Sequence, residues 1–254
     1  MSIIGVVSMK GGVGKTSITA NLAAAMATML GANRVSVLDL DPQNGLHWHL
    51  GIEETGSTGV CTQSLQDREW RDVAFESTFG VACLPYGMVD EPNRKAFETL
   101  LADHPDWVGS QLQDTGLDDG GVILIDTPPG PSVYLKQVFA CADLILIVLL
   151  TDAGSYATIP SMESWLKDVL PRRPGLRSAY VLNQVDRSEI LNRDVADMLR
   201  QHLGERLVTA GIHSDETVGE ALAFQQPVLV YDPHGQASHD LTQLAAWAID
   251  TLNQ

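Results

Sequence analysis

The sequence predicts an α/β fold with a mostly parallel central sheet and helices on both of its faces. Short apolar runs alternate with longer amphipathic segments, and no linker rich in proline, glycine or serine interrupts the alternation. Several runs are apolar at successive positions, which is typical of strands buried on both faces of a parallel sheet. A chain of 254 residues suits one large domain or two small ones, and the unbroken alternation favours a single domain over residues 1–254.

The expected elements follow one another in regular order from the N-terminus. The apolar runs predict the main strands, over 3–8, 34–41, 80–87, 121–126, 143–150 and 178–186. Two short last strands are expected over 206–212 and 227–232. An alanine-rich helix is expected over 17–30. A last helix over 239–252 has apolar residues at helical spacing, which predicts one buried face.

The first strand and the first helix are joined by the glycine-rich segment SMKGGVGKTS, residues 8–17. Backbone N–H groups of such a loop, with the partial positive charge of the helix N-terminus, can hold phosphate oxygens. We expect Lys15 to reach the β- and γ-phosphates and the Thr16 hydroxyl to bind Mg²⁺. A glycine-rich turn without a ligand is the alternative, but Gly-Lys-Thr between a strand and a helix favours a single-domain P-loop NTPase. The residues predicted to bind the nucleotide here are Gly11, Gly12, Val13, Gly14, Lys15, Thr16 and Ser17.

Acidic residues end two of the predicted strands. The strand VILID ends in Asp126, as in the Walker B pattern, and this carboxylate can hold the Mg²⁺ shell. Asp39 and Asp41 end another strand on one face, at the carboxyl edge where parallel sheets bind ligands. We assign Asp39 to the water shell of the metal and Asp41 to positioning the attacking water. The alternative is that one of this pair only caps the turn after the strand.

The glycine-rich segment departs from the usual pattern G-x-x-x-x-G-K-[ST], because Met9 stands where the first glycine is required. With KGGVGKTS, DLDPQ and DTPP, the chain resembles the deviant Walker A ATPases, the ParA/MinD group, over essentially its whole length. The resemblance implies that the ligands are ATP and Mg²⁺, and that Lys10 is the signature lysine of the group. It also implies a homodimer with ATP sandwiched at the interface, where Lys10 reaches the nucleotide of the other subunit. A lysine there adds positive charge where the transition state spreads negative charge.

The same resemblance implies where adenine binds and what the site does. Asn183 in LNQVD would read the base, and the segment around Pro227 would line it. An ordinary turn residue at a strand end is the alternative for Asn183. With Lys10, Lys15 and Asp41 as the catalytic residues, a slow Mg-dependent ATPase that acts as a switch is expected. A pure ATP-dependent scaffold has the same sequence features.

Charge and cysteine content weigh against three roles known in this group. The formal net charge is −16 at pH 7, and Arg206 is the last basic residue. Nonspecific DNA binding and a MinD-like basic membrane helix are therefore disfavoured. The three cysteines, Cys61, Cys83 and Cys141, form no CxxC, which disfavours the metal-cluster relatives and indicates reduced thiols. No signal peptide is expected, and the apolar run 144–150 is too short to span a bilayer.

Two stretches, residues 68–87 and 212–231, resemble the BcsQ-type proteins of bacterial cellulose secretion. They contain Trp-Arg-Asp before Leu-Pro-Tyr-Gly, and His-Ser-Asp-Glu before Gln-Pro-Val. The resemblance implies an ATP-dependent dimerising switch that supports cellulose synthesis by docking on the inner-membrane synthase complex or on other membrane machinery. We therefore expect a cytoplasmic protein that its partners recruit to the inner membrane. The alternative is a ParA-type ATPase for DNA partition or for positioning another cargo.

Two further patterns are expected to be structural. His47 and His49 have no third ligand nearby, so a solvated loop or helix start is expected rather than a metal site. The segment PRRPG, residues 171–175, is expected to form a basic surface turn. A contact with a partner is the alternative for this turn.

Overall fold

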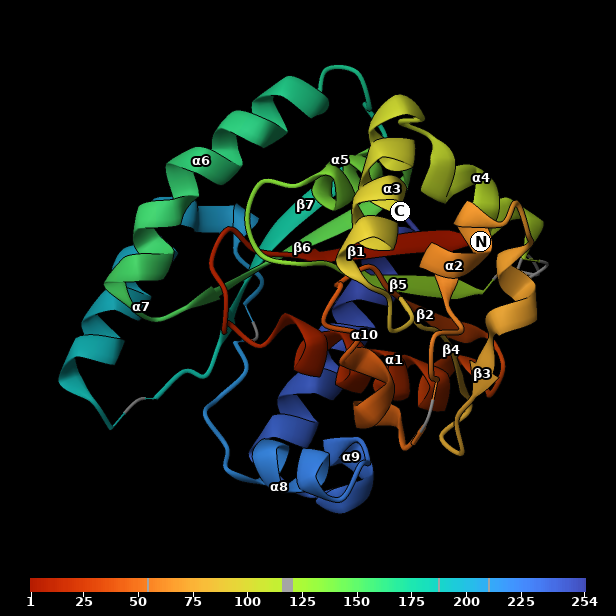
Figure 1. Ribbon diagram of the computed structural model, residues 1–254. Helices are drawn as coiled ribbons and strands as arrows, with labels where there is room; N and C mark the ends of the chain where they lie inside the picture. Colours follow the sequence, from red (N-terminus) through yellow and green to blue (C-terminus); the bar gives the residue numbers. More distant parts are fainter. Residues whose placement is uncertain (54, 116–120, 187, 210) are drawn as a thin grey trace.

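A seven-stranded sheet forms the centre of the structure (Figure 1). The structure is a computed structural model and describes residues 1–53, 55–115, 121–186, 188–209 and 211–254. The strand order is β3-β4-β2-β5-β1-β6-β7, and only β3 runs antiparallel to its neighbour. The strands are β1 (Ser2–Val7), β2 (Val35–Asp39), β3 (Phe75–Glu76), β4 (Val81–Leu84), β5 (Val122–Asp126), β6 (Leu144–Leu150) and β7 (Arg177–Asn183).

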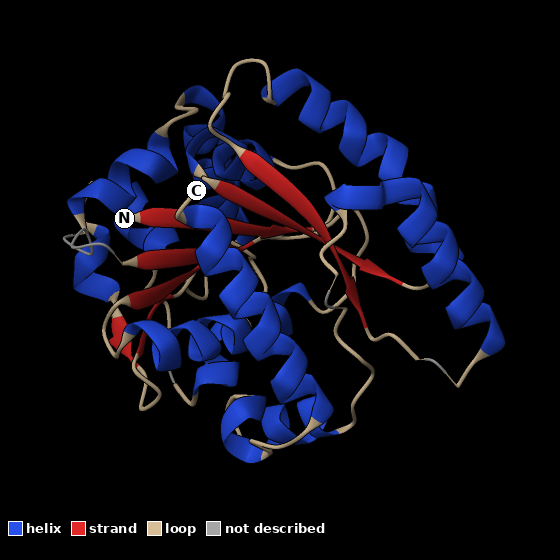
Figure 2. Cartoon of the chain, turned by 180° about the vertical axis from the view of Figure 1, so that it is seen from behind, coloured by secondary structure: helices blue, strands red, loops and turns tan. Residues whose placement is uncertain are grey.

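Helices lie on both faces of this twisted sheet, as Figure 2 shows from behind. In Figure 1, α1, α8, α9 and α10 lie below the sheet, and α3, α4 and α5 lie above it. The helices are α1 (Lys15–Leu30), α2 (Val60–Leu65), α3 (Glu91–Asp103), α4 (Trp107–Asp114), α5 (Val133–Cys141), α6 (Ala153–Val169), α7 (Ile190–Leu203), α8 (Thr217–Ala223), α9 (Val228–Tyr231) and α10 (Gln236–Leu252). Short 3₁₀ helices are η1 (Leu46–Leu50), η2 (Trp70–Val73) and η3 (Gly204–Arg206).

Alternate residues of β1 enter two different cores. Ile3 and Val7 pack on the face covered by α3 to α7, whereas Ile4 and Val6 pack on the face covered by α1 and α10. Because side chains alternate across a strand, a strand buried on both faces must be apolar at nearly every position. The predicted α/β fold is therefore confirmed. Within the described part of the chain, no helix combines the length and the apolar character needed to cross a membrane.

The strand expected over 227–232 is absent, and that prediction was wrong. Residues Val228–Tyr231 form the short helix α9 instead. Pro227 precedes the helix and has no N–H to donate to a neighbouring strand. The Asn21 side chain of α1 accepts the Val228 N–H at 2.7 Å. The segment is therefore held against α1 and not at a sheet edge.

The strand expected over 206–212 is also absent from the described residues of that segment, which exclude residue 210. Leu207 pairs with Tyr180 of β7 only through an isolated bridge. The other predicted strands and both predicted helices are confirmed. At the far edge of the sheet, β3 is a two-residue strand that the sequence did not predict, because so short a segment has no measurable periodicity.

Candidate nucleotide-binding site

The loop between β1 and α1 has the backbone of a phosphate cradle. Gly12 and Gly14 have φ angles of 72° and 87°, in the left-handed region that favours glycine. The Ser8 hydroxyl accepts the Lys10 N–H at 2.9 Å and donates to the Lys10 carbonyl at 2.6 Å, which fixes the start of the loop. The loop borders a cavity of about 340 Å³ that Asp41 also lines. Of the predicted loop residues, all but the buried Val13 line this one cavity.

Lys15, Thr16 and Asp126 come together at the first turn of α1. The Thr16 hydroxyl donates to Asp126 Oδ2 at 2.6 Å, whereas Asp126 Oδ1 is buried without a hydrogen-bond partner in the described residues. Lys15 is only 6% exposed. Burial lowers the pKa of Lys15, and the charges of Asp126 and Asp41 oppose this change. Burial also raises the pKa of Asp126, against the hydrogen bond from Thr16 and the charge of Lys15.

The two aspartates after β2 have different surroundings. Asp39 lies beside Asp126 in the register of β2 and β5, and its oxygens accept the backbone N–H groups of Asp41 at 2.9 Å and Leu46 at 3.1 Å. Burial raises the pKa of Asp39 well above its usual range, and the Asp126 charge raises it further. Asp41 accepts the Gln43 N–H at 2.9 Å and lines the cavity at the loop. Asp39 therefore caps the turn after β2, which is the alternative that the sequence left open for one of the two aspartates. Its role in the water shell of the metal stays a prediction.

Lys10 is held within its own chain. Its ammonium forms an ion pair with Asp152, the N-cap of α6, whose carboxylate also accepts the Ser155 N–H at 2.6 Å. Both side chains of the pair are partly exposed, at 33% and 41%. Sequence reasoning missed Asp152, although its place two residues after the strand predicted over 143–150 puts it at the same sheet edge as Asp41. The predicted reach of Lys10 into a second subunit stays a prediction.

A second cavity, of about 250 Å³, also borders the first turn of α1 and shares Gly14 and Ser17 with the first cavity. Asn183 at the end of β7 lines it and donates from Nδ2 to the Val13 carbonyl at 2.8 Å. A Cβ atom at Gly14 would lie 2.4 Å from this Nδ2, so glycine is needed there to keep the Asn183 amide in place. Gln184, which sequence reasoning missed, lines both cavities. Asn183 is therefore more than a turn residue, because it joins β7 to the loop.

The outer wall of the second cavity comes from the segment 212–219, which begins one of the BcsQ-like stretches. His213 contacts Asp240 of α10 through its N–H at 2.9 Å and its Nδ1 at 2.8 Å. Asp215 accepts the Ala237 N–H of the same helix at 3.1 Å. These contacts fasten the wall to α10. Pro227 is buried at the start of α9 and does not line this cavity, so its contact with the base stays a prediction.

The other residues singled out in the sequence belong to the core or to turns. Trp70, from the first BcsQ-like stretch, is 1% exposed and donates from Nε1 to the Ser64 hydroxyl at 2.9 Å. His47 and His49 lie in η1 and are buried, so the expectation of a solvated segment was wrong. Burial lowers the pKa of His49 to about 4. The segment 171–175 is a surface turn, as predicted.

Comparison with known proteins assigns the chain to a family. It matches the family described as cellulose biosynthesis protein BcsQ over residues 1–249. The cellulose biosynthesis protein BcsQ of Salmonella typhi is 29% identical, over 98% of this chain and 94% of that protein. The chromosome-partitioning ATPase Soj of Thermus thermophilus is 28% identical, over 95% of this chain and 93% of that protein.

A solved structure has the same fold. The septum site-determining protein MinD of Pyrococcus horikoshii, complexed with Mg-ADP, has a TM-score of 0.78 to this chain at 24% identity. The match covers 97% of this chain and 95% of that one. The family match spans almost every residue, and the chain has the sheet order and glycine loop described above. The chain therefore belongs to the BcsQ family of ParA/MinD-like P-loop ATPases.

Proposed function

We propose that this chain binds ATP with Mg²⁺ and works as an ATP-dependent dimerising switch in cellulose synthesis. The observation that carries the proposal lies at the first turn of α1, beside the buried Lys15. There the Thr16 hydroxyl donates to Asp126 Oδ2, and the other oxygen of that carboxylate, Oδ1, is buried without a hydrogen-bond partner among the described residues. A buried carboxylate oxygen beside a hydroxyl suits Mg²⁺, which keeps several waters and takes few protein ligands. Membership of the BcsQ family supports the cellulose context, and the MinD relative solved with Mg-ADP supports the ligand.

The chemistry that we propose divides among residues already close together. Thr16 and Asp126 hold Mg²⁺, with Asp39 acting through its water shell. The metal neutralises charge on the phosphates when it is bound. Lys15 binds the β- and γ-phosphates, and its burial strengthens that attraction because the local dielectric constant is low. Asp41 orients the attacking water, a role that its position in the lining of the cavity at the loop supports.

Dimerisation is the output of the proposed switch. Contacts that exist only with the γ-phosphate favour a closed dimer, so ATP shifts the population towards it. Lys10 would then leave Asp152 and add its charge at the nucleotide of the other subunit. The closed dimer docks on the inner-membrane synthase complex or on other membrane machinery, and hydrolysis releases it.

Variants at Asp41, Lys15 and Lys10 separate these steps. Asp41→Ala should bind ATP and accumulate as a dimer, measured by light scattering with and without ATP. Lys15→Ala should lose ATP binding. Lys10→Ala should keep ATP binding and lose the turnover that depends on protein concentration. If Asp41→Ala stays monomeric at saturating ATP, the sandwiched dimer is wrong.

The docking part of the proposal needs a test in cells. The Asp41→Ala protein should hold its partners longest, so it is the bait for affinity purification from its own cells, followed by mass spectrometry. Lys15→Ala is the matched control, because it should not reach the closed form. Synthase subunits enriched only with Asp41→Ala support the proposal. Equal recovery with both baits would contradict ATP-dependent docking.

DNA partition is the second candidate, because the Soj protein is nearly as similar as the BcsQ relative. The formal charge of −16 and the absence of Lys and Arg after Arg206 oppose it. Filter binding of plasmid DNA with ATP distinguishes the two. Tight retention that falls steeply with salt would favour partition over cellulose synthesis.

A further inference from the structure

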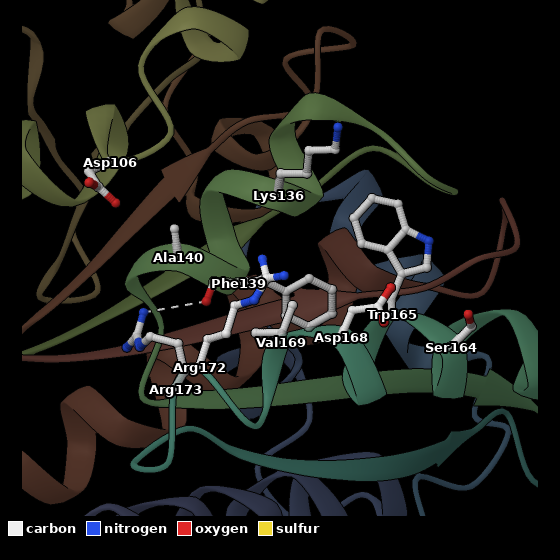
Figure 3. A pocket seen from close by; sticks show the side chains of 10 residues that line it. All are labelled: Asp106, Lys136, Phe139, Ala140, Ser164, Trp165, Asp168, Val169, Arg172 and Arg173. Carbon is white, nitrogen blue, oxygen red and sulfur yellow. Dashed lines mark hydrogen bonds between the residues drawn. The ribbon is translucent and has the colours of Figure 1, made fainter.

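A third cavity lies away from the nucleotide site, between α5, α6 and the start of α4 (Figure 3). Its volume is about 650 Å³, within the roughly 300–1,000 Å³ typical of ligand pockets. The cavity lies towards the ends of α5 and α6, and each of these helices runs back from the edge of the sheet that carries the glycine loop. None of its lining residues takes part in the proposed ATP chemistry. The cavity therefore needs a separate explanation.

Two aromatic rings form the apolar wall of this cavity. Phe139 of α5 and Trp165 of α6 are stacked, with ring centroids 6.1 Å apart and planes inclined by 27°. Phe139 is 2% exposed and supports the ring above it, whereas Trp165 is only partly buried. An indole that is fixed on one side and open on the other is a stacking surface for a flat ligand.

Basic side chains stand beside these rings. Lys136 and Arg172 line the cavity, are exposed, and form no ion pair with a described residue. Arg173 is fixed, because it donates to the Ala142 carbonyl at 2.9 Å and to the Phe139 carbonyl at 3.4 Å. Arg172 and Arg173 belong to the PRRPG turn, whose role the proposed function leaves open. In a chain with a formal charge of −16, basic residues grouped around one hollow are a local exception.

Two acidic residues limit what the cavity can accept. Asp168 lies on α6, four residues before Arg172, and Asp106 lies at the start of α4. In Figure 3, Asp106 lies at the opposite end of the lining from Trp165, so it bears least on a ligand at the rings. Three basic and two acidic side chains leave the lining with one excess positive charge. That balance suits one anionic group and disfavours a polyanion.

We propose that this cavity binds a small aromatic anion, with a flat ring on Trp165 and one anionic group at Arg172 and Lys136. Carboxylate, sulfonate and phosphate share the required chemistry, because each accepts charge-assisted hydrogen bonds from guanidinium and ammonium. A ligand there contacts both α5 and α6. These helices begin next to the nucleotide site, α6 at Asp152 and α5 just after the segment of Pro129, which lines the cavity at the loop.

The probe for the test is 8-anilinonaphthalene-1-sulfonate, an aromatic ring system with one sulfonate group. Titration of the full chain without nucleotide, followed by probe fluorescence and calorimetry, should give one site per chain. Arg172→Glu should weaken this site about tenfold or more, since a lost charge-assisted bond costs about 1.5–3 kcal/mol. Trp165→Leu should also weaken it, because the stacking surface is lost. Arg193→Glu is the matched control on α7 and should leave the affinity unchanged, since Arg193 is exposed and does not line the cavity.

Thermal unfolding of each variant checks that the fold is kept, and Arg172→Glu is expected to keep it because its side chain is exposed. Phenyl phosphate and phenylacetate, which share the phenyl ring, should displace the probe, and the stronger competitor identifies phosphate or carboxylate as the preferred group. Probe binding with the same affinity in wild type and Arg172→Glu would overturn the proposal. Failure of both competitors at millimolar concentration would do the same. The test needs no ATP, so its outcome is independent of the proposed switch.

Discussion

In the proposed switch Lys10 must reach the other subunit, so its ion pair with Asp152 would oppose the proposed dimer. In the single chain the two side chains satisfy each other. Before Lys10 can reach another subunit, this ion pair must break. A partly exposed ion pair contributes about 0–1 kcal/mol, so breaking it costs little free energy.

Asp152→Asn should therefore strengthen ATP-dependent dimerisation, by up to about fivefold per released Lys10. Asparagine keeps the N-cap of α6, where Asp152 accepts the Ser155 N–H, and removes only the charge. Sedimentation with ATP measures the dimer constant, and Asp152→Ala, which also loses the cap, is the comparison for helix stability. A dimer constant that is weaker in Asp152→Asn than in wild type would show that Asp152 supports the dimer.

His49 makes stability depend on pH. Its pKa is lowered by burial from 6.5 to about 4, so between these values the unfolded chain binds a proton that the folded chain does not. The free energy of unfolding therefore falls as the pH drops from 6.5 towards 4, and His49 accounts for a loss of up to about 3 kcal/mol. Above pH 6.5 the histidine is neutral in both states and this loss is absent. His49→Gln should flatten this part of the unfolding free energy curve, measured with urea at several pH values. The control is His234→Gln, at an exposed histidine, which should leave the curve unchanged. Parallel curves for wild type and His49→Gln would refute the assignment to His49.

At the scale of elements, the packing of α5 on β1 depends on a glycine in the strand. A Cβ atom at Gly5 would lie 2.2 Å from Val138 Cγ1 and 3.0 Å from the end of the Ile145 side chain. The absence of a side chain at Gly5 thus lets α5 approach the sheet. This helix starts beside the glycine loop and ends at the third cavity, so its position affects both sites.

Gly5→Ala should lower the free energy of unfolding by about 1–3 kcal/mol, because the new methyl group overlaps Val138. Val138→Ala removes the overlapping atom. The double variant should therefore be more stable than the sum of the two single changes predicts, by about 1 kcal/mol or more. Urea unfolding with equal m-values is the measurement. Additive effects would mean that α5 shifts to accommodate the new methyl group without strain.

At the scale of the whole molecule, the proposed ligands should stabilise the fold, because the site joins β1, α1, β2 and β5. ATP with Mg²⁺ at a hundred times its dissociation constant should add about 2.7 kcal/mol. That corresponds to a rise in melting temperature of about 5–10 °C for a chain of this size. Lys15→Ala should lose the rise and the exposed Lys167→Ala should keep it. A rise of equal size in Lys15→Ala would place the nucleotide elsewhere.

Most of the sheet and the glycine loop could be predicted because their signals are local. A strand buried on both faces is apolar at successive positions, and Gly-Lys-Thr between a strand and a helix needs no distant residue to be recognised. The same reasoning gave a wrong prediction for the segment at 227–232. Its apolar run has strand character, but Pro227 and the contact of Val228 with Asn21 turn it into α9. Local propensity was overridden by a partner far away in the chain.

The sequence by itself determined the alternation of strands and helices, the glycine loop with Lys15 and Thr16, and the acidic strand ends. Only the tertiary structure decided that Lys10 pairs with Asp152, that Asn183 holds Val13, and that Asp39 is engaged by backbone N–H groups. It also decided that the PRRPG turn meets Trp165 at a cavity. Periodicity and motif spacing carry information over a few residues, whereas the Lys10 and Asn183 contacts join segments more than a hundred residues apart. Such contacts arise only when the parallel sheet brings its carboxyl edges together.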